Sequence, residues 1–198
     1  MRRLSREFYA RDTRVVARDL LGKVVCSVTD GVAEGVAAGA AGDDRAPKQA
    51  RIVETEAYHG SDDGASHARG GPTPRSAIMF GPAGHAYIYL IYGMWYCLNV
   101  VTGDSGFPSA VLIRAGEILG ADDVRAGAGP GKLCRALGLG RGQNGIDLVT
   151  SARLWIAEDD FARGRVRRGP RINVAYAGSW ADRPWRFWIA DHPSVSRT

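Results

Sequence analysis

The sequence predicts an α+β fold: a single domain in which a mainly antiparallel sheet carries a few short flanking helices. Three observations lead to this prediction. Short apolar or alternating segments bounded by turn formers recur along the 198 residues. Helical periodicity is confined to two short stretches, near residues 12–22 and 129–139. The length suits one domain, which we assign to residues 1–198, and no P-loop for a nucleotide cofactor is present.

The first half of the chain predicts one helix and two strands. Asp12 is a typical N-cap for a helix that ends at Gly22. Residues 23–28 predict a buried strand, and residues 51–58 alternate as a second one. Residues 29–50, between them, are rich in Gly and Ala and predict a flexible insertion. The apolar stripe of the helix consists of Val15, Val16, Ala17, Leu20 and Leu21.

The second half predicts a long loop followed by strands. Residues 59–84 contain many turn formers and no clean period, which is typical of a loop that carries function. Residues 85–101 flank Gly93 with β-formers and predict a hairpin. A strand at 110–116 and a short helix at 129–139 follow, with Pro130 in the first turn of that helix. The remaining predicted strands are residues 153–158, 171–176 and 185–190, with an arginine-rich stretch to Arg168 between the first two.

The chain is basic, with 26 Lys and Arg against 21 Asp and Glu, a formal net charge of +5. Residues 1–25 hold seven basic and three acidic residues, and residues 151–198 hold nine and five. If the two ends meet in space, they form a face suited to a polyanion such as nucleic acid. The competing explanation is compositional bias, since 23 of the basic residues are arginines.

Other features bear on compartment and metals. No apolar run approaches the ~18 residues of a membrane helix, and the basic N-terminal segment lacks the apolar core of a secretion signal. Cys26, Cys97 and Cys134 have no zinc-binding spacing, so we expect buried structural thiols in a reducing compartment and no metal site. We therefore expect a soluble cytoplasmic protein without a cofactor.

Two glutamates in the strand at 51–58 are candidates for acid–base chemistry. Period two places Glu54, Glu56 and Tyr58 on one face together with Ile52, so the two carboxylates lie roughly 6–7 Å apart. Partial burial would raise the pKa of one of them and prepare a general base. The alternative is a solvated pair, or a pair that arginines neutralise.

Aromatic and polar residues near the hairpin are the other candidates. The rings either pack a core or stay exposed, where they can stack on bases or wedge between them. Asn99 and Arg114 interrupt apolar strands and need partners if they are buried. Arg114 facing Glu56 would either position a water or form an ordinary salt bridge, and His67 stands in the irregular loop. The aromatic residues are Tyr87, Tyr89, Tyr92, Trp95 and Tyr96.

Three blocks in this order, ETEAY at 54–58, YIYLIYGM at 87–94 and GPGKLCRAL at 129–137, closely resemble the alkyladenine (3-methyladenine) DNA glycosylases of the mammalian type, which also occur in bacteria. The resemblance runs from about Leu4 to Arg197 and is interrupted mainly by residues 29–50. It implies a curved sheet with a protruding hairpin that inserts into DNA. It also implies a DNA repair enzyme for alkylated purines, with deaminated purines as a further class.

The resemblance implies roles for the catalytic group. Glu56 would be the base that activates a water, and Arg114 would help to hold that water, with a main-chain carbonyl near Val174 as a further partner. No role follows for Glu54. Trp95 stands where the mammalian proteins have a tyrosine.

The resemblance also implies how the lesion is held. The flipped base would lie between Tyr58 and His67 on one side and Tyr89 on the other, with Asn99 screening the purine 2-position. Tyr92 would fill the vacated place in the stack through the minor groove. In addition, Lys132 at a helix N-terminus preceded by Gly-Pro-Gly is a candidate phosphate contact.

These roles fit the chemistry of the lesion. An alkylated purine is electron-poor, stacks well on electron-rich rings and leaves easily. No lysine occurs in the ETEAY block, the His67 loop or the hairpin, so we expect a monofunctional glycosylase that leaves an abasic site. Its partner would be double-stranded DNA containing damaged purines. We expect a bacterial protein that acts as a monomer and is associated with the nucleoid through DNA.

Three other readings of the sequence remain. A catalytically silent module that binds damaged DNA would not need the pair Glu56 and Arg114. A nucleosidase for small molecules would not need Tyr92 or a basic face. A metal-dependent nuclease would need a cluster of ligands that the spacing of His and Cys does not suggest.

Overall fold

A long central strand, β3 (Lys48–His59), organises the fold. The structure is a computed structural model and describes residues 1–28 and 46–196. The first part of β3 pairs with β2 (Val24–Ser27), and its second part pairs with β9 (Arg186–Ile189). Its other edge pairs with β6 (Ser109–Ile118) along most of its length. β3 therefore joins the two ends of the chain to the middle.

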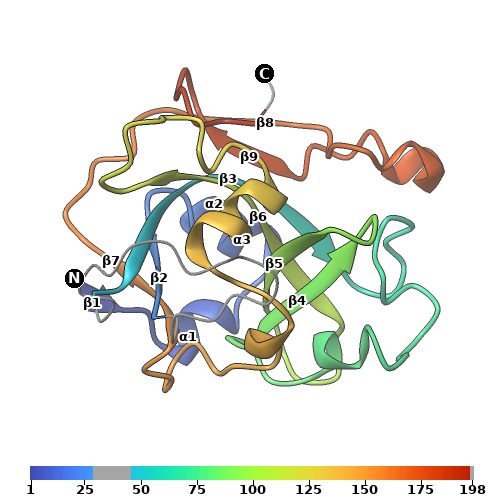
Figure 1. The fold of residues 1–198 in the computed structure, drawn as a ribbon. Coiled ribbons are helices and arrows are strands. Elements are labelled where there is room, and N and C mark those ends of the chain that lie inside the picture. Colours follow the sequence, from blue (N-terminus) through green and yellow to red (C-terminus); the bar gives the residue numbers. More distant parts are fainter. Residues whose placement is uncertain (29–45, 197–198) are drawn as a thin grey trace.

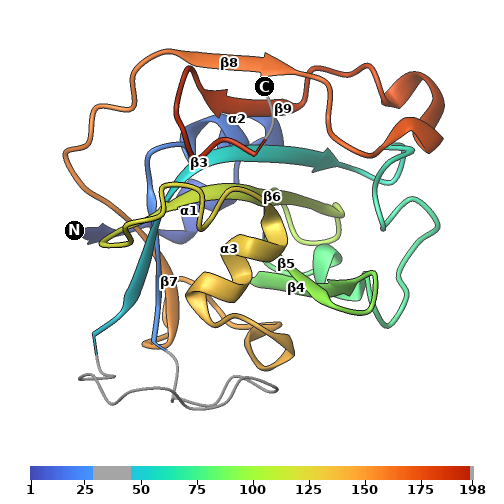
Figure 2. The same ribbon diagram turned by 45° about the horizontal axis from the view of Figure 1, so that its top comes forward.

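The strands form one curled sheet, shown in Figures 1 and 2. Beyond β6 lie β5 (Trp95–Val101) and β4 (Ala86–Ile91), and beyond β2 lie β7 (Leu154–Glu158) and β1 (Arg2–Arg3). β8 (Val166–Gly169) pairs with β9 and crosses the top of the molecule in Figure 2. Every pair among the described strands is antiparallel. The predicted α+β class is confirmed.

Short helices pack against this sheet. In Figure 1, α3 (Pro130–Leu137) lies in front of β5 and β6, and α2 (Thr13–Asp19) lies behind β3 and β6. α1 (Arg6–Tyr9) and the 3-10 helices η1 (Ala77–Phe80), η2 (Arg141–Gln143) and η3 (Ala175–Trp180) complete the set. No helix in the described part of the chain is long and apolar enough to cross a bilayer.

The two predicted helices are present and end as their sequences indicate. The Asp12 carboxylate accepts hydrogen bonds from the backbone N–H groups of Arg14 and Val15, which caps α2. α3 has Pro130 in its first turn and ends at Gly138, which adopts the left-handed conformation. The assignment of Val15 to the buried apolar stripe was wrong, because Val15 is exposed. It lies about 100° around the helix from its buried neighbour and so faces solvent.

Two predicted boundaries need correction. The segment 171–176 is not a strand, because Asn173 has a positive φ of 62° and η3 begins at Ala175. β3 begins at Lys48, inside the range assigned to the insertion, because residues 48–50 find hydrogen-bonding partners in β2. The rest of that predicted insertion, residues 29–45, lies outside the described residues.

Candidate active site

Two irregularities in the pairing of β3 with β6 place the charged residues of the site. The register shifts between Ile52 and Glu54 and again between Glu54 and Thr55, so Val53 and Arg114 have no partner in the ladder. Such a bulge re-aims side chains and interrupts strict alternation. Ile52 consequently packs in the main core with Val53, and not beside the glutamates as period two predicts.

Glu56 is completely buried, and its carboxylate accepts two hydrogen bonds and lies beside one arginine. Its Oε1 accepts a hydrogen bond from the Ile172 backbone N–H at 2.8 Å, and its Oε2 accepts one from the Tyr58 hydroxyl at 2.9 Å. The Nε of Arg114 lies 3.6 Å from Oε1. Burial raises the pKa of Glu56 above its usual range, although these three donors act in the opposite direction. A carboxyl group with a raised pKa and fixed geometry suits a general base.

A cavity of about 410 Å³ adjoins the contacts of Glu56, although Glu56 itself is not among the residues that line it. Tyr58, Arg114 and Ile172, the three residues that contact Glu56, all contribute to its lining. This volume falls within the range of small-molecule sites. Every residue predicted to bind the base or the water also lines the cavity: Tyr58, His67, Tyr89, Asn99, Arg114 and Val174.

The rings of the cavity are arranged differently from the expectation. His67 and Tyr89 contact each other edge to face, with ring centroids 4.7 Å apart. A base stacked between them would need roughly twice the ~3.5 Å contact distance, so these two rings cannot lie on opposite sides of it in this structure. The His67 Nδ1 is also hydrogen-bonded to the Tyr87 hydroxyl at 3.0 Å. His67 and Tyr89 therefore belong to one wall, whereas Tyr58 packs in a separate cluster with Val174 and Ala177.

The protonation of His67 follows from its surroundings. Partial burial, and to a lesser degree Arg75, lower the pKa of His67 to about 4. The guanidinium of Arg75 lies 4.7 Å from the centre of the Tyr89 ring. This wall therefore offers a neutral imidazole, and the nearby Arg75 is not among the residues that line the cavity.

Two further predicted residues are fixed by main-chain contacts. Asn99 is buried, and its Nδ2 donates to the carbonyl oxygens of Tyr87 and Cys97 at 3.0 and 3.3 Å. The Val174 carbonyl already accepts a hydrogen bond from the Ala177 N–H at 2.9 Å. It retains a second lone pair for a water. The main-chain group that contacts Glu56 itself is the Ile172 N–H, which sequence reasoning missed.

The hairpin of β4 and β5 ends in an exposed aromatic side chain. Tyr92 is 75% exposed, and the following Met94 is 69% exposed. Tyr92 has a φ of 53°, a conformation that bulky residues rarely adopt, and Gly93 next to it has a φ of 70°. An aromatic ring at this position costs about 1 kcal/mol or more in backbone strain. Such a strained, exposed aromatic residue favours a role at this tip over a packing role.

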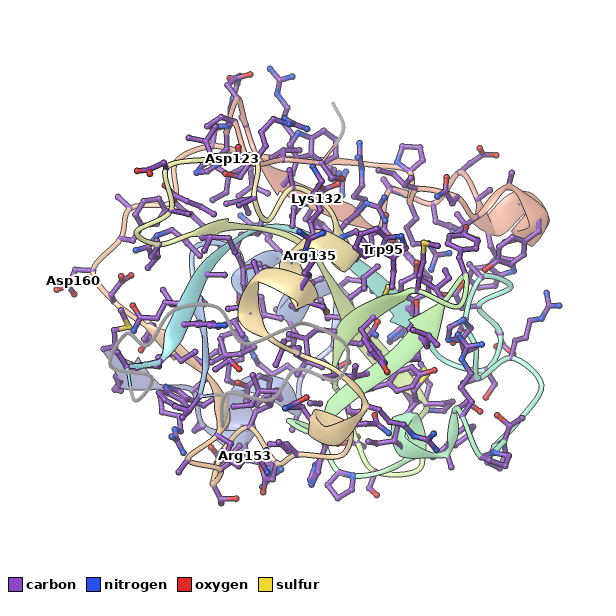
Figure 3. All side chains as sticks on the ribbon, in the orientation of Figure 1. Trp95, Asp123, Lys132, Arg135, Arg153 and Asp160 are labelled. Atoms are coloured by element: carbon purple, nitrogen blue, oxygen red, sulfur yellow. The ribbon has the colours of Figure 1, made fainter. Side chains whose placement is uncertain are left out.

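The N-terminus of α3 lies beside the hairpin, as Figure 3 shows for Trp95 and Lys132. A Cβ on Gly131 would come within 2.7 Å of the Trp95 ring, so the larger ring at this position packs on the helix where only glycine fits. Lys132 is exposed and lines the cavity. Because Lys132 does reach the cavity, the absence of lysine from the ETEAY block, the His67 loop and the hairpin does not by itself argue against a Schiff base.

A buried ion pair that sequence reasoning missed supports the loop that carries His67. Arg171 donates to both oxygens of Asp63 at 2.6 and 2.8 Å, and both side chains are inaccessible to solvent. Its guanidinium also donates to the Ala57 carbonyl and lies 4.8 Å from the centre of the Tyr58 ring. Neither the spacing nor the context of Asp63 indicated this pairing, because its partner lies more than a hundred positions away.

The charge of the two chain ends is largely compensated. The ends do meet, since β1 pairs with β7, but basic residues there form ion pairs with carboxylates. Lys132, Arg135 and Arg141 come instead from the middle of the chain, and none of them forms an ion pair within the described residues. Figure 3 shows Lys132 and Arg135 on the same side of α3. The paired residues of the N-terminal end are Arg2, Arg6, Arg11, Arg14 and Lys23.

Cysteines and metal ligands complete the description. Cys26, Cys97 and Cys134 are buried and carry free thiols, and Cys97 also lines the cavity. Across residues 1–28 and 46–196, no three His, Cys, Asp or Glu side chains come together in a group that could hold a metal ion.

Comparisons with known proteins agree on one family. The model of the family described as methylpurine-DNA glycosylase (MPG) matches residues 7–193. Three relatives carry the name "Putative 3-methyladenine DNA glycosylase". One from Anaeromyxobacter dehalogenans (strain 2CP-C) is 55% identical, with 98% of this chain and 87% of the relative aligned. One from Methanocella arvoryzae is 46% identical over 98% and 96% of the two chains, and one from Legionella pneumophila (strain Lens) is 46% identical over the full length of both.

Proposed function

The chain belongs to the methylpurine-DNA glycosylase family, and from that premise we propose that it removes alkylated purines, 3-methyladenine among them, from double-stranded DNA by hydrolysing the N-glycosidic bond. The observation that carries this proposal is the completely buried Glu56, whose three hydrogen-bonding or ionic partners line an aromatic cavity. A carboxylate in this setting serves water activation, which a module that only binds DNA does not need.

The first step in the proposed mechanism is extrusion of the damaged nucleotide. A base inside a duplex cannot reach a cavity of this kind, so it must be flipped out at a cost of a few kcal/mol. The exposed Tyr92 ring would offset part of that cost by stacking in the vacated place. Uncompensated charge on Lys132 and Arg135 supports phosphate contacts on the same side of α3.

The second step is recognition within the cavity. We place the flipped base between Tyr58 and the wall formed by His67 and Tyr89, because those two rings contact each other. A cationic 3-methyladenine gains from the electron-rich rings, and the neutral His67 adds no repulsion. Asn99, with its amide nitrogen committed to main-chain carbonyls, is a rigid group that a purine 2-amino group would meet.

The third step is attack by water. Each Glu56 oxygen has a further lone pair, so the carboxylate can accept a proton from a water placed beside Arg114, which lines the cavity. The oxygen of that water forms a bond to C1′ as the bond from C1′ to the purine nitrogen breaks. The Glu56 carboxylate stabilises the oxocarbenium-like sugar. A cationic alkylated purine departs as a neutral molecule, whereas a neutral lesion departs as an anion that takes a proton from solvent. The products are the free base and an abasic site, and the enzyme carries no covalent intermediate.

We include deaminated purines such as hypoxanthine as a second substrate class and propose a monofunctional enzyme. The experiment uses duplexes carrying one ethenoadenine or one hypoxanthine, together with methylated DNA, without added metal. The proposal expects free base and an abasic strand that breaks only on alkali treatment, with no borohydride-trapped complex. A trapped complex that Lys132→Ala abolishes would show a lyase step. Tight lesion binding without base release would favour the silent DNA-binding module, and release from free nucleosides would favour a nucleosidase.

A further inference from the structure

A second glutamate, Glu54, lies beside the proposed catalytic base and has no part in the mechanism above. It is completely buried, like Glu56, and both belong to β3. Burying a carboxylate is costly unless it is paired and hydrogen-bonded. The contacts of Glu54 therefore indicate its role.

The described contacts of Glu54 are all with donor groups. Its Oε1 accepts a hydrogen bond from Arg186 Nη1 at 3.1 Å, and its Oε2 accepts one from the Ser196 backbone N–H at 2.8 Å. The Nε of Arg114 lies 3.4 Å from Oε1. These donors come from three different elements, β9, the segment that follows it, and β6. They suit an ionised carboxylate, because a protonated one would need an acceptor.

Arg114 is shared between the two glutamates. Its Nε lies 3.4 Å from Glu54 and 3.6 Å from Glu56, and this buried nitrogen forms a well-aligned hydrogen bond with neither. A guanidinium N–H that were committed to one carboxylate would lie at about 2.8–2.9 Å. Arg114 is thus held at an intermediate position by opposing attractions.

We propose that Glu54 is a positioning residue that holds Arg114 away from a tight ion pair with Glu56 and thereby keeps Glu56 basic enough to take a proton from water. This inference rests on the proposed function of Glu56. It assigns the two glutamates different tasks: Glu56 exchanges a proton, and Glu54 competes for Arg114 and so sets how much of the Arg114 charge Glu56 experiences.

Apart from Glu54 and the two arginines, the groups around Glu56 do not carry a charge that could tune its basicity. Tyr58 and Cys97 face it from β3 and β5, and burial raises the pKa of both, that of Cys97 to about 11, so they stay neutral. The Ile172 N–H is a fixed dipole. Arg186, the residue paired with Glu56 in the β3–β9 ladder, is engaged by Glu54. The charged side chains that can tune Glu56 are therefore Glu54 and the two arginines.

Removing the charge of Glu54 should have a definite sign. In Glu54→Gln, Arg114 moves toward Glu56 and the repulsion between the two carboxylates disappears, so Glu56 loses its proton at lower pH. The acidic limb of the pH–rate profile for base release should shift down by roughly one unit, and the rate above the limb should fall because the base is weaker. In Arg186→Gln, Glu54 attracts Arg114 more strongly, and the limb should move to higher pH.

The experiment measures single-turnover release of ethenoadenine from pH 4.5 to 9 for the wild type, Glu54→Gln, Glu54→Asp and Arg186→Gln. Glu54→Asp keeps the charge and should keep the limb at the wild-type pH. Asp159→Asn is the matched control, because it removes a carboxylate from an arginine pair with Arg51 that takes no part in the cavity. Circular dichroism before each assay establishes that the variants are folded.

Opposite shifts in Glu54→Gln and Arg186→Gln would support the proposal. An unmoved limb with a rate lowered equally at every pH would overturn it, since that pattern belongs to a purely structural role. If Glu54→Gln does not fold, Arg186→Gln still decides, because an unmoved or lowered limb there contradicts the proposal. A wild type that releases no base would instead overturn the function proposed for Glu56.

Discussion

The floor of the cavity and the tip of the hairpin belong to the same sheet, but they differ in burial: the side chains of the floor are buried and those of the tip are exposed. By the floor we mean Glu54, Glu56 and Arg114, of which only Arg114 lines the cavity, and all three are buried among donors and ions that fix them from several elements. At the tip, Tyr92 and Met94 are largely exposed, and Tyr92 has a strained φ. The fixed side chains of the floor suit a reaction, whereas the exposed side chains of the tip suit contact with DNA. Damage to the floor should therefore abolish chemistry, and damage to the tip should weaken only the delivery of the lesion.

The largest expected effect separates the two regions at Glu56. Glu56→Gln keeps the shape of the floor but removes the base, so single-turnover release should fall about 10²–10⁴-fold. Binding to a lesion duplex should stay within a few-fold of the wild type. Free base measured by chromatography checks the rate, and Glu7→Gln, in α1, is the control. Full activity in Glu56→Gln would contradict the assignment of the base.

The next effect concerns the support of the floor. Asp63→Asn removes one partner of a fully buried ion pair and leaves Arg171 uncompensated, so the free energy of unfolding should fall by about 3–5 kcal/mol. Urea unfolding measures this change. The exposed pair of Arg165 with Asp191 offers the matched control, and Asp191→Asn should cost about 1 kcal/mol or less. Equal losses in the two variants would show that burial does not distinguish these pairs.

A smaller effect is expected at the tip. Tyr92→Ala removes the ring but leaves Glu56 and its contacts unchanged. One stacking contact is worth about 1–3 kcal/mol, so lesion binding should weaken roughly 5- to 150-fold. Titration of a hypoxanthine duplex measures the change, and Tyr92→Phe should restore binding. A Tyr92→Ala variant that binds and flips like the wild type would remove the tip from the mechanism.

The subtlest effect is a dependence of stability on pH. Because the pKa of Glu56 is raised in the folded state, the folded protein binds this proton more tightly than the unfolded chain does. Its contribution to stability is present below the ordinary value of 4.5 and is lost as pH rises through the raised value. The glutamine in Glu56→Gln does not titrate and so does not lose this contribution. As pH rises across this window, the free energy of unfolding of Glu56→Gln should therefore increase relative to that of the wild type. Urea unfolding at several pH values checks the sign, and a difference independent of pH would contradict it.

The sequence predicted those parts of the fold that local patterns determine. Alternation located β3, the apolar residues around Gly93 located the hairpin, and Asp12 located the start of α2. The prediction of a strand at residues 171–176 was wrong. The apolar residues there are typical of a strand, but the backbone turns at Asn173 and the Ile172 N–H faces Glu56. Tertiary contact overrode local propensity there.

The site was predicted as a set of residues but not as an arrangement. The resemblance named Tyr58, His67 and Tyr89, and all three line one cavity. Their distribution between the walls depends on side-chain packing that motifs do not encode. The pairing of Asp63 with Arg171 joins segments far apart in the chain, and no local pattern could reveal it. Likewise, the position of Arg114 between the two glutamates depends on two register shifts in the pairing of β3 with β6.

The central claim, that the tip extrudes the lesion and the floor cleaves the bond, is tested most directly by following both events on one substrate. Ethenoadenine fluoresces more strongly outside the stack, so stopped-flow fluorescence reports flipping while quenched samples report base release. Glu56→Gln should flip at the wild-type rate and release almost nothing. Tyr92→Ala should flip less of the lesion and release it in proportion to the flipped fraction. Loss of flipping in Glu56→Gln, or normal flipping with slow release in Tyr92→Ala, would contradict the division of tasks between the two regions.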